Sequence, residues 1–382
     1  MHKDNIKLDS LFSGQMDKKT IIENIFKKNF NIKSGETCLI YTDKILPDEN
    51  LAENDRQRRI KLIDIANDFK EIGAGFAKIK YREYDSLKEH GTEPPFLIWE
   101  TAFGDKITDF IVENKLWDNI KNKTLKQNEK NFLSEFIKTN NGSCVGCVIA
   151  LPNFSTSHTL FRDLLTKYGD TRFASLPLFE DSIFSTALNI DPAELAEFTL
   201  EINNKLKDAS IINITSDNGT DVMFYIRDNG FMADTGLLDK PGTFSNLPAG
   251  EVYTAPVEGK TEGKFVMEYS PTKKLDEPLT VFIENGKVKY IEGTDKFKDH
   301  IMSAIKNNEL VSNIAELGIG TNKSAKNFLN ILEAEKIYGT IHMALGDNSS
   351  FGGNVRVNFH EDFILFNPNI TVTTKSGAVF KL

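Results

Sequence analysis

Cysteine and histidine are scarce in this chain, and long apolar runs are absent. Three cysteines, Cys38, Cys144 and Cys147, occur among 382 residues, too few for a disulfide framework and consistent with a reducing compartment. No apolar run approaches the roughly 20 residues that cross a bilayer. The first five residues carry charge but no apolar core, unlike a secretory signal. These absences predict a soluble, cytoplasmic protein with no membrane partner.

Basic charge is not in excess either. The 46 basic and 55 acidic side chains give a net charge of −9, which argues against nucleic acid or an anionic membrane as a partner. With 40% hydrophobic residues the composition is globular, and 382 residues exceed what one hydrophobic core usually supports. We therefore expect two domains.

Three short motifs have ordinary structural explanations. Cys144 and Cys147 stand at a metal-binding spacing, but no second Cys or His pair accompanies them, so a turn before a strand is the simpler interpretation. The Gly73-Ala74-Gly75 segment follows a helical pattern, the reverse of the order that a dinucleotide-binding motif requires. The basic run 56–59 lies among acidic residues, as on a solvated helix face.

The first half alternates strands and helices, the pattern of a parallel α/β sheet. Strands are expected at 36–41 and 75–81, and helices at 58–70, within 105–140 and from the N-cap Asp191 to Lys207. We assign residues 1–208 to an N-terminal α/β domain.

The second half is dominated by hairpin patterns. Residues 209–214 and 221–226 flank turn residues, and residues 280–284 and 287–291 flank Asn285-Gly286, the preferred pair for a two-residue turn. Helices are expected at 295–308 and 324–336. The predicted fold class is thus α/β plus α+β, with a parallel-sheet N-terminal domain and a mostly antiparallel β domain over residues 209–382 that carries a metal site.

The metal site is predicted from five potential ligands in the last third of the chain: Glu251, Glu316, His342, His360 and Asp362. Side chains alternate along a strand, so His360 and Asp362 share one face and can bind one ion while Glu361 points away. Glu316 and Glu251 lie in apolar segments, where an unpaired carboxylate would be costly. Buried ion pairs and structural histidines explain the same residues, and the sequence leaves both possibilities open.

These segments together resemble the thermophilic aminopeptidase family, also called the aminopeptidase T or leucyl aminopeptidase type. The resemblance rests on residues 246–259, 315–322, 332–348 and 360–362, with a weaker match around 157–162 and 175–177. It implies a homodimeric, cytoplasmic metallo-aminopeptidase, a hydrolase that removes amino acids from peptides with a free N-terminus. Two divalent ions (zinc, cobalt or manganese) would be held by the five ligands and would activate a water molecule.

Other roles follow from the same resemblance. Glu335, with Glu333 as a weaker choice, matches an acidic residue that would act as general base, although a salt bridge to Lys336 is equally compatible with its position. His158, Arg162 and Asn348 are candidates for substrate binding. The family's peptidases carry a tyrosine shortly after the His342 segment, whereas this chain has Phe351, which has no hydroxyl. Efficient peptidase activity is therefore not implied.

Two alternatives accompany this prediction. Dihydroxypyridine dioxygenases resemble the same half of the chain and hold a single ferrous ion, for which Glu316, His360 and Asp362 could serve. The presence of Glu251 and His342 favours the hydrolase, since one ion leaves these two without an evident role. A non-catalytic protein that retains the fold is the third interpretation.

Overall fold

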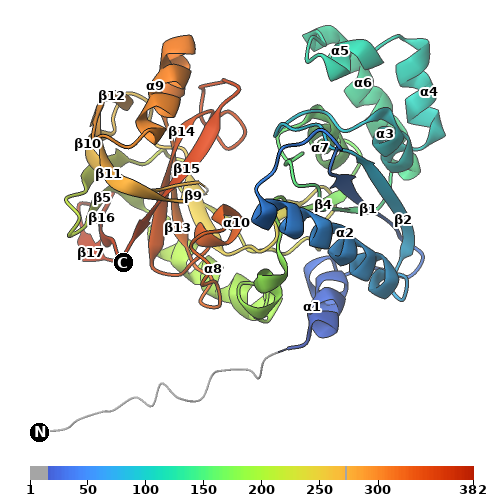
Figure 1. Cartoon of the computed structure of the whole chain (residues 1–382), viewed down its shortest axis with the longest axis horizontal. Coiled ribbons are helices and arrows are strands. Elements are labelled where there is room, and N and C mark those ends of the chain that lie inside the picture. Colours follow the sequence, from blue (N-terminus) through green and yellow to red (C-terminus); the bar gives the residue numbers. More distant parts are fainter. Residues whose placement is uncertain (1–15, 272) are drawn as a thin grey trace, which may run out of the picture.

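The computed structural model describes residues 16–271 and 273–382, arranged in two lobes (Figure 1). The charged N-terminal segment considered above lies outside these residues. Within the described ranges, no helix is long and apolar enough to span a membrane. The predicted fold class is confirmed: one lobe is built on a parallel sheet with helices, and the other on antiparallel sheets.

The N-terminal lobe is built on a five-stranded parallel sheet of order β2-β1-β3-β4-β8. Its strands are β1 (Thr37–Lys44), β2 (Lys78–Asp85), β3 (Cys147–Ala150), β4 (Arg172–Ser175) and β8 (Phe244–Asn246). Alternate residues of β1 enter different cores, Cys38 and Ile40 on one face and Leu39 and Tyr41 on the other. Both faces are therefore covered, as parallel sheets require.

Helices lie on both faces of this sheet (Figure 1). One face packs against α1 (Lys18–Asn24) and α2 (Glu53–Gly73). The other face is covered by α3 (Phe96–Phe103), α4 (Asp105–Glu113), α5 (Trp117–Lys121), α6 (Gln127–Thr139) and α7 (Leu160–Lys167). The predicted helices at 58–70 and within 105–140 are present, and α2 ends at Gly73 as expected.

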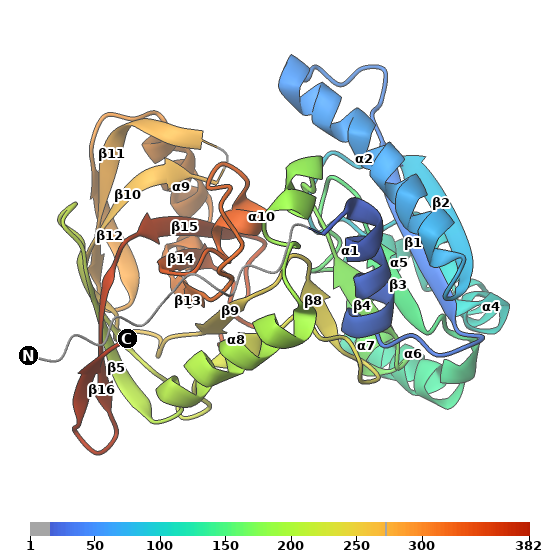
Figure 2. The same cartoon turned by 90° about the horizontal axis from the view of Figure 1, so that it is seen from below.

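The lobes are joined through α8 (Pro192–Leu206), which begins at the predicted N-cap, where the Asp191 side chain accepts a hydrogen bond from the Ala193 N–H. Leu195 packs in the N-terminal core, whereas Ile202 and Leu206 belong to the C-terminal core. Figure 2 shows α8 lying along the C-terminal lobe, with one end directed toward the N-terminal lobe. The chain later returns to the parallel sheet, because β8 pairs with β4. The division at 208/209 stays a prediction.

The C-terminal lobe contains a seven-stranded antiparallel sheet of order β12-β11-β10-β6-β5-β16-β17. Its strands are β5 (Ala209–Thr215), β6 (Asp221–Tyr225), β10 (Glu262–Ser270), β11 (Lys273–Glu284), β12 (Lys287–Glu292), β16 (Asn369–Thr374) and β17 (Val379–Lys381). Both predicted hairpins are present, and the second turns at Asn285 (φ 53°) and Gly286 (φ 68°). These left-handed angles are those of the primed turn that this pair favours.

A second antiparallel sheet, of order β15-β14-β13-β9-β7, faces the N-terminal lobe. It contains β7 (Met232–Asp234), β9 (Glu251–Thr254), β13 (Ile314–Gly320), β14 (Thr340–Gly346) and β15 (His360–Phe366). Apolar residues of both antiparallel sheets share one core, on which α9 (Phe297–Asn307) also packs.

The helix predicted at 324–336 is wrong for most of its length, since only α10 (Ile331–Ala334) forms. Side chains compete for the backbone groups that a helix would use. Glu333 accepts hydrogen bonds from the N–H groups of Lys326 and Asn327, and Asn322 accepts from Ser324 and Ala325. These bonds hold an irregular loop in place of the first turns of a helix.

Candidate metal centre

The predicted ligands lie on one face of the five-stranded sheet β15-β14-β13-β9-β7. Side chains alternate between the faces of a strand, and here the opposite face carries the apolar residues Val252, Leu317, Ile319, Ile341, Met343 and Phe363, which are part of the core. The remaining positions point away from that core. They include all five predicted ligands: Glu251, Glu316, His342, His360 and Asp362.

Three of these ligands converge. Glu316, His360 and Asp362 offer donor atoms that all lie within 4.8 Å of one another, the one such group of three or more in the described part of the chain. The Nε2 atom of His360 lies 3.4 Å from Glu316 Oε2 and 3.5 Å from Asp362 Oδ2. Glu316 and Asp362 both lie opposite Ala344, whose small side chain leaves room between them.

The orientation of His360 is fixed by its second nitrogen. Nδ1 lies 2.8 Å from the Asp347 carbonyl oxygen, so it carries the proton and donates, which leaves Nε2 free to bind a metal ion. Glu361 points to the other side of the strand, where its carboxylate lies 2.8 Å from His300 Nε2. The alternation predicted for residues 360–362 is therefore present.

The electrostatics of the group favour a bound cation. Burial alone would lower the pKa of His360, but the carboxylates of Asp362 and Glu316 outweigh burial and hold this pKa well above its usual value. Burial conversely opposes ionisation of Glu316, yet its bonds to His342 and His360 lower its pKa. Such an anionic, partly enclosed group attracts positive charge.

The geometry fits one divalent ion. Donor atoms held about 2.1 Å from a common ion lie about 3.0 to 3.4 Å apart for octahedral or tetrahedral angles. The observed separations of 3.4 and 3.5 Å need little adjustment to reach that range. Asp362 Oδ1 is buried without a hydrogen-bond partner among the described residues, and a metal ion would satisfy it. The three residues can therefore hold one ion with open coordination positions.

His342 lies beside this group rather than in it. Its Nε2 is 3.4 Å from both Glu251 Oε2 and Glu316 Oε1. Burial lowers its pKa, but these carboxylates raise it to about 9 overall. Gly318 makes the position possible, because a Cβ added there would lie 2.0 Å from His342 Nε2.

Glu251 is occupied by an ion pair. The Nζ atom of Lys336 lies 2.6 Å from Glu251 Oε1 and 3.0 Å from Glu335 Oε2, and the lysine side chain is 1% exposed. Burial opposes the charge on Lys336, but Glu251 and Glu335 hold its pKa well above the usual value. Burial raises the pKa of Glu335 to about 7 against the effect of Lys336. The expected salt bridge of Glu335 is thus present, next to the ligands.

Glu333 and Asn348 have structural contacts. Besides its bonds to the 326–327 backbone, Glu333 accepts a hydrogen bond from Thr186. The Asn348 amide donates to Glu258 and its oxygen accepts from the Val355 N–H, while the residue is fully buried. Both polar ends of Asn348 therefore hold the 347–355 loop, and its predicted substrate contact stays a prediction.

The N-terminal lobe contributes His158 and Arg162 to the opposite wall. The two imidazole rings of His158 and His360 have centroids 6.1 Å apart. Desolvation and the nearby positive charges of His360 and Arg162 lower the pKa of His158, although the residue is exposed to solvent. Arg162 Nε donates to the Ser157 carbonyl oxygen at 2.7 Å. The structure thus brings both predicted residues to the metal-binding face.

The sequence did not reveal two contributors and revealed a third in part. Asp347 fixes His360 through a main-chain carbonyl, and the partly buried Asp234, bonded to Ser245 at 2.5 Å, adds a carboxylate near Glu251. Main-chain contacts leave no trace in side-chain patterns. Lys336 was expected to pair with its sequence neighbour Glu335, but its pairing with Glu251 crosses 85 residues and has no local signal.

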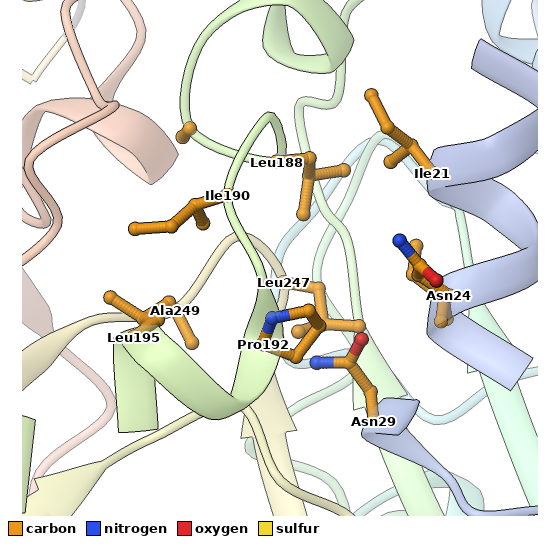
Figure 3. A pocket seen from close by; sticks show the side chains of 11 residues that line it. Ile21, Asn24, Asn29, Leu188, Ile190, Pro192, Leu195, Leu247 and Ala249 are labelled. Atoms are coloured by element: carbon orange, nitrogen blue, oxygen red, sulfur yellow. The ribbon is translucent and has the colours of Figure 1, made fainter. Parts of the chain in front are cut away.

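A small apolar cavity lies elsewhere, between α1 and the start of α8 (Figure 3). Ile21, Leu188, Ile190, Leu195 and Leu247 line it, and its free volume is about 20 Å³, close to the minimum for a single water molecule. It is too small for a substrate and contains none of the predicted ligands.

Comparison with known proteins relates this site to one sequence family. Residues 189–376 match the family model described as NicX, 2,5-dihydroxypyridine 5,6-dioxygenase. The 2,5-dihydroxypyridine 5,6-dioxygenase of Pseudomonas putida KT2440 is 26% identical over 188 residues, which are 45% of this chain and 53% of that protein. The match thus spans about half the length of this curated relative.

Two solved structures share the fold over nearly the whole chain. The 2,5-dihydroxypyridine dioxygenase of P. putida KT2440 superposes with a TM-score of 0.65 at 17% identity, covering 95% of this chain and 96% of that one. AmpT from Thermus thermophilus gives a TM-score of 0.57 at 13% identity with the same coverage, 95% and 96%. The chain therefore shares the fold of both proteins.

Between these two proteins, the sequence match favours the dioxygenase over the aminopeptidase. The motifs had suggested the opposite order, because Glu251 and His342 had no evident role around a single ion. The structure gives both residues partners, Lys336 for Glu251 and Glu316 for His342. The main argument for a dinuclear hydrolase is thereby removed.

Proposed function

We propose that this protein is a non-haem iron dioxygenase that cleaves a dihydroxylated aromatic ring, similar in kind to 2,5-dihydroxypyridine. The observation that carries the proposal is the Glu316–His360–Asp362 group, which lies inside the segment matched by the dioxygenase family model. Three ligands on one side of an ion, with open positions opposite, are typical of non-haem ferrous oxygenases. This chain would use two carboxylates and one histidine.

When bound, ferrous iron would supply the redox chemistry that adds both atoms of dioxygen to the ring. Glu316, His360 and Asp362 would hold the ion, and the Asp347 carbonyl keeps His360 Nε2 directed at it. Glu251 and Lys336 neutralise each other beside the site. On the side of the N-terminal lobe, a neighbour of the proposed ligands is His158, whose ring centroid lies 6.1 Å from that of His360.

Two residues of the N-terminal lobe would bind the ring. The pKa of His158 is lowered, so its imidazole is neutral, and within the described ranges its ring nitrogens have no hydrogen-bond partner; it can therefore accept a hydrogen bond from a ring hydroxyl. The Arg162 guanidinium would place a positive charge near an oxygen substituent of the ring. It stacks on Phe244 at 4.7 Å and is held by the Ser157 carbonyl, so it is positioned before substrate binds.

The decisive experiment is iron content per chain after anaerobic reconstitution, combined with oxygen consumption in the presence of 2,5-dihydroxypyridine. We expect one iron per chain, lost in Glu316→Gln and Asp362→Asn and retained in Glu251→Gln. Glu361→Gln is the matched control, because this carboxylate lies on the same strand but faces His300. Two ions per chain, with one lost in Glu251→Gln, would reject the mononuclear site.

An aminopeptidase remains the second candidate because the fold is shared with AmpT and because Glu335, whose pKa is raised to about 7, is suited to a general base. In that case Glu251 would exchange Lys336 for a second ion. Release of leucine from a leucyl peptide with zinc or manganese, abolished in Glu335→Gln, would support this candidate. Failure to bind any metal would support the non-catalytic alternative.

A further inference from the structure

Tyr253 faces the metal centre from the neighbouring strand. On β9, Val252 points into the core, so Glu251 and Tyr253 share the opposite face. Tyr253 lies directly across from Gly318 on β13 and from Met232 on β7. Gly318 has no side chain to cover the phenol ring, and Tyr253 is only partly buried. The ring therefore lies on the sheet face that carries the proposed ligands rather than in the core.

The ring belongs to a series of aromatic contacts that includes the predicted ligand His360. Tyr253 and Phe351 have centroids 5.8 Å apart with an interplanar angle of 72°, and Phe351 and His360 have centroids 5.9 Å apart at 89°. Edge-to-face pairs of this kind hold the rings in fixed orientations. His158 continues the series on the other side of His360.

The hydroxyl group of Tyr253 is available to a ligand. It forms no hydrogen bond with any residue of 16–271 or 273–382, although its surroundings include Asp234, Glu316 and Arg162. Burial raises the pKa of the phenol, so the group is neutral and can donate a proton in a hydrogen bond. A polar hydroxyl inside an apolar wall usually has a partner.

We propose that Tyr253 contacts the substrate, donating a hydrogen bond from its hydroxyl to an oxygen substituent of a planar aromatic ring that lies against Phe351 and His360. The class of ring rests on the proposed function, but the assignment of Tyr253 rests on the geometry of β9.

The competing explanation is that Tyr253 only packs against Phe351. Packing uses the ring and not the oxygen, so the two explanations differ for Tyr253→Phe, which removes the hydroxyl and keeps the ring. Tyr290→Phe is a matched control, because Tyr290 stacks on Phe282 of a strand outside the site sheet and is 44% exposed.

The test is equilibrium binding to zinc-loaded protein, in which the ring probes are not oxidised, measured by titration calorimetry. The probes are 2,5-dihydroxypyridine, 3-hydroxypyridine, which lacks one hydroxyl, and leucine amide. We expect Tyr253→Phe to weaken binding of 2,5-dihydroxypyridine about five- to tenfold, as loss of one neutral hydrogen bond does. The same substitution should weaken binding of 3-hydroxypyridine less, and Tyr290→Phe should leave the binding of both rings unchanged. Circular dichroism and zinc content equal to wild type would exclude misfolding.

The outcomes separate the two proposals. If wild-type protein binds the ring probes and Tyr253→Phe binds them equally well, Tyr253 does not contact the substrate, while the proposed function stands. If wild-type protein binds leucine amide and neither ring, both the proposed function and the role of Tyr253 are wrong.

Discussion

Lys336 offers the sharpest test of whether the carboxylates of the site pair with a side chain or bind a second metal ion. Its ammonium is 1% exposed and lies 2.6 Å from Glu251 and 3.0 Å from Glu335. Lys336→Met keeps most of the side-chain volume but leaves Glu251 as a buried carboxylate without its cation. Removing one partner of a buried pair costs about 3–5 kcal/mol, and we expect a loss in that range.

A double-mutant cycle isolates the pair. Glu251→Gln combined with Lys336→Met contains neither charge, so we expect it to recover about 2–3 kcal/mol of the loss. The assay should follow hydrogen exchange at the β9 and β14 amides. Tryptophan fluorescence would report on the other lobe, because both tryptophans, Trp99 and Trp117, lie in α3 and α5.

Two results would refute this reasoning. A loss below about 1 kcal/mol in Lys336→Met, the range of exposed pairs, would mean that the buried pair does not form in solution. Coupling that is present in metal-free protein but disappears in saturating zinc would mean that Glu251 leaves Lys336 for an ion, as the dinuclear hydrolase requires. Under the mononuclear proposal the coupling persists with metal bound.

Three further predictions concern other parts of the chain. Gly318→Ala places a methyl group 2.0 Å from His342 Nε2 and should cost about 1–3 kcal/mol and weaken iron binding, whereas Gly142→Ala, with nothing within 4 Å, should do neither in the same assays. Burial raises the pKa of Glu93 from 4.5 to about 7, so the folded state holds this proton more tightly than the unfolded state. The resulting stability, on the order of 3 kcal/mol, is complete below pH 4.5 and is lost as pH rises through 7. Glu93→Gln should remove this pH dependence of the free energy of unfolding, and an unchanged profile across that window would contradict the prediction. Glu333→Gln should speed proteolytic cleavage of the 324–330 loop, and cleavage at the wild-type rate would show that the carboxylate does not hold the loop.

The sequence was sufficient for the elements whose signals are local. The Asn285-Gly286 hairpin, the start of α8 at Asp191 and the end of α2 at Gly73 all depend on residues within a few positions of each other. The helix predicted at 324–336 was wrong because the signal that decides this segment is not local. Its apolar spacing resembles a helix, but Glu333 binds backbone groups six and seven residues earlier, a competition that periodicity does not reveal.

The candidate site could likewise be predicted only where its signals are local. Alternation along β15 was enough to predict that His360 and Asp362 face together, and the apolar context of Glu316 predicted that it needs a positive partner. The number of ions could not be predicted, because it depends on how carboxylates from β9 and β13 are shared between His342 and Lys336 across three strands. Only strand register, which places Gly318 opposite both His342 and Tyr253, determines those neighbours.

The residues that face each other at the candidate metal centre come from separate stretches of the chain. Every proposed ligand lies within residues 189–376, the part that resembles the dioxygenase family, whereas His158 and Arg162 lie before it. Under the proposed function, substitutions before residue 189 would change which molecules are accepted and leave the proposed ligands in place. This part of the chain is therefore the natural one to exchange when a new substrate is sought.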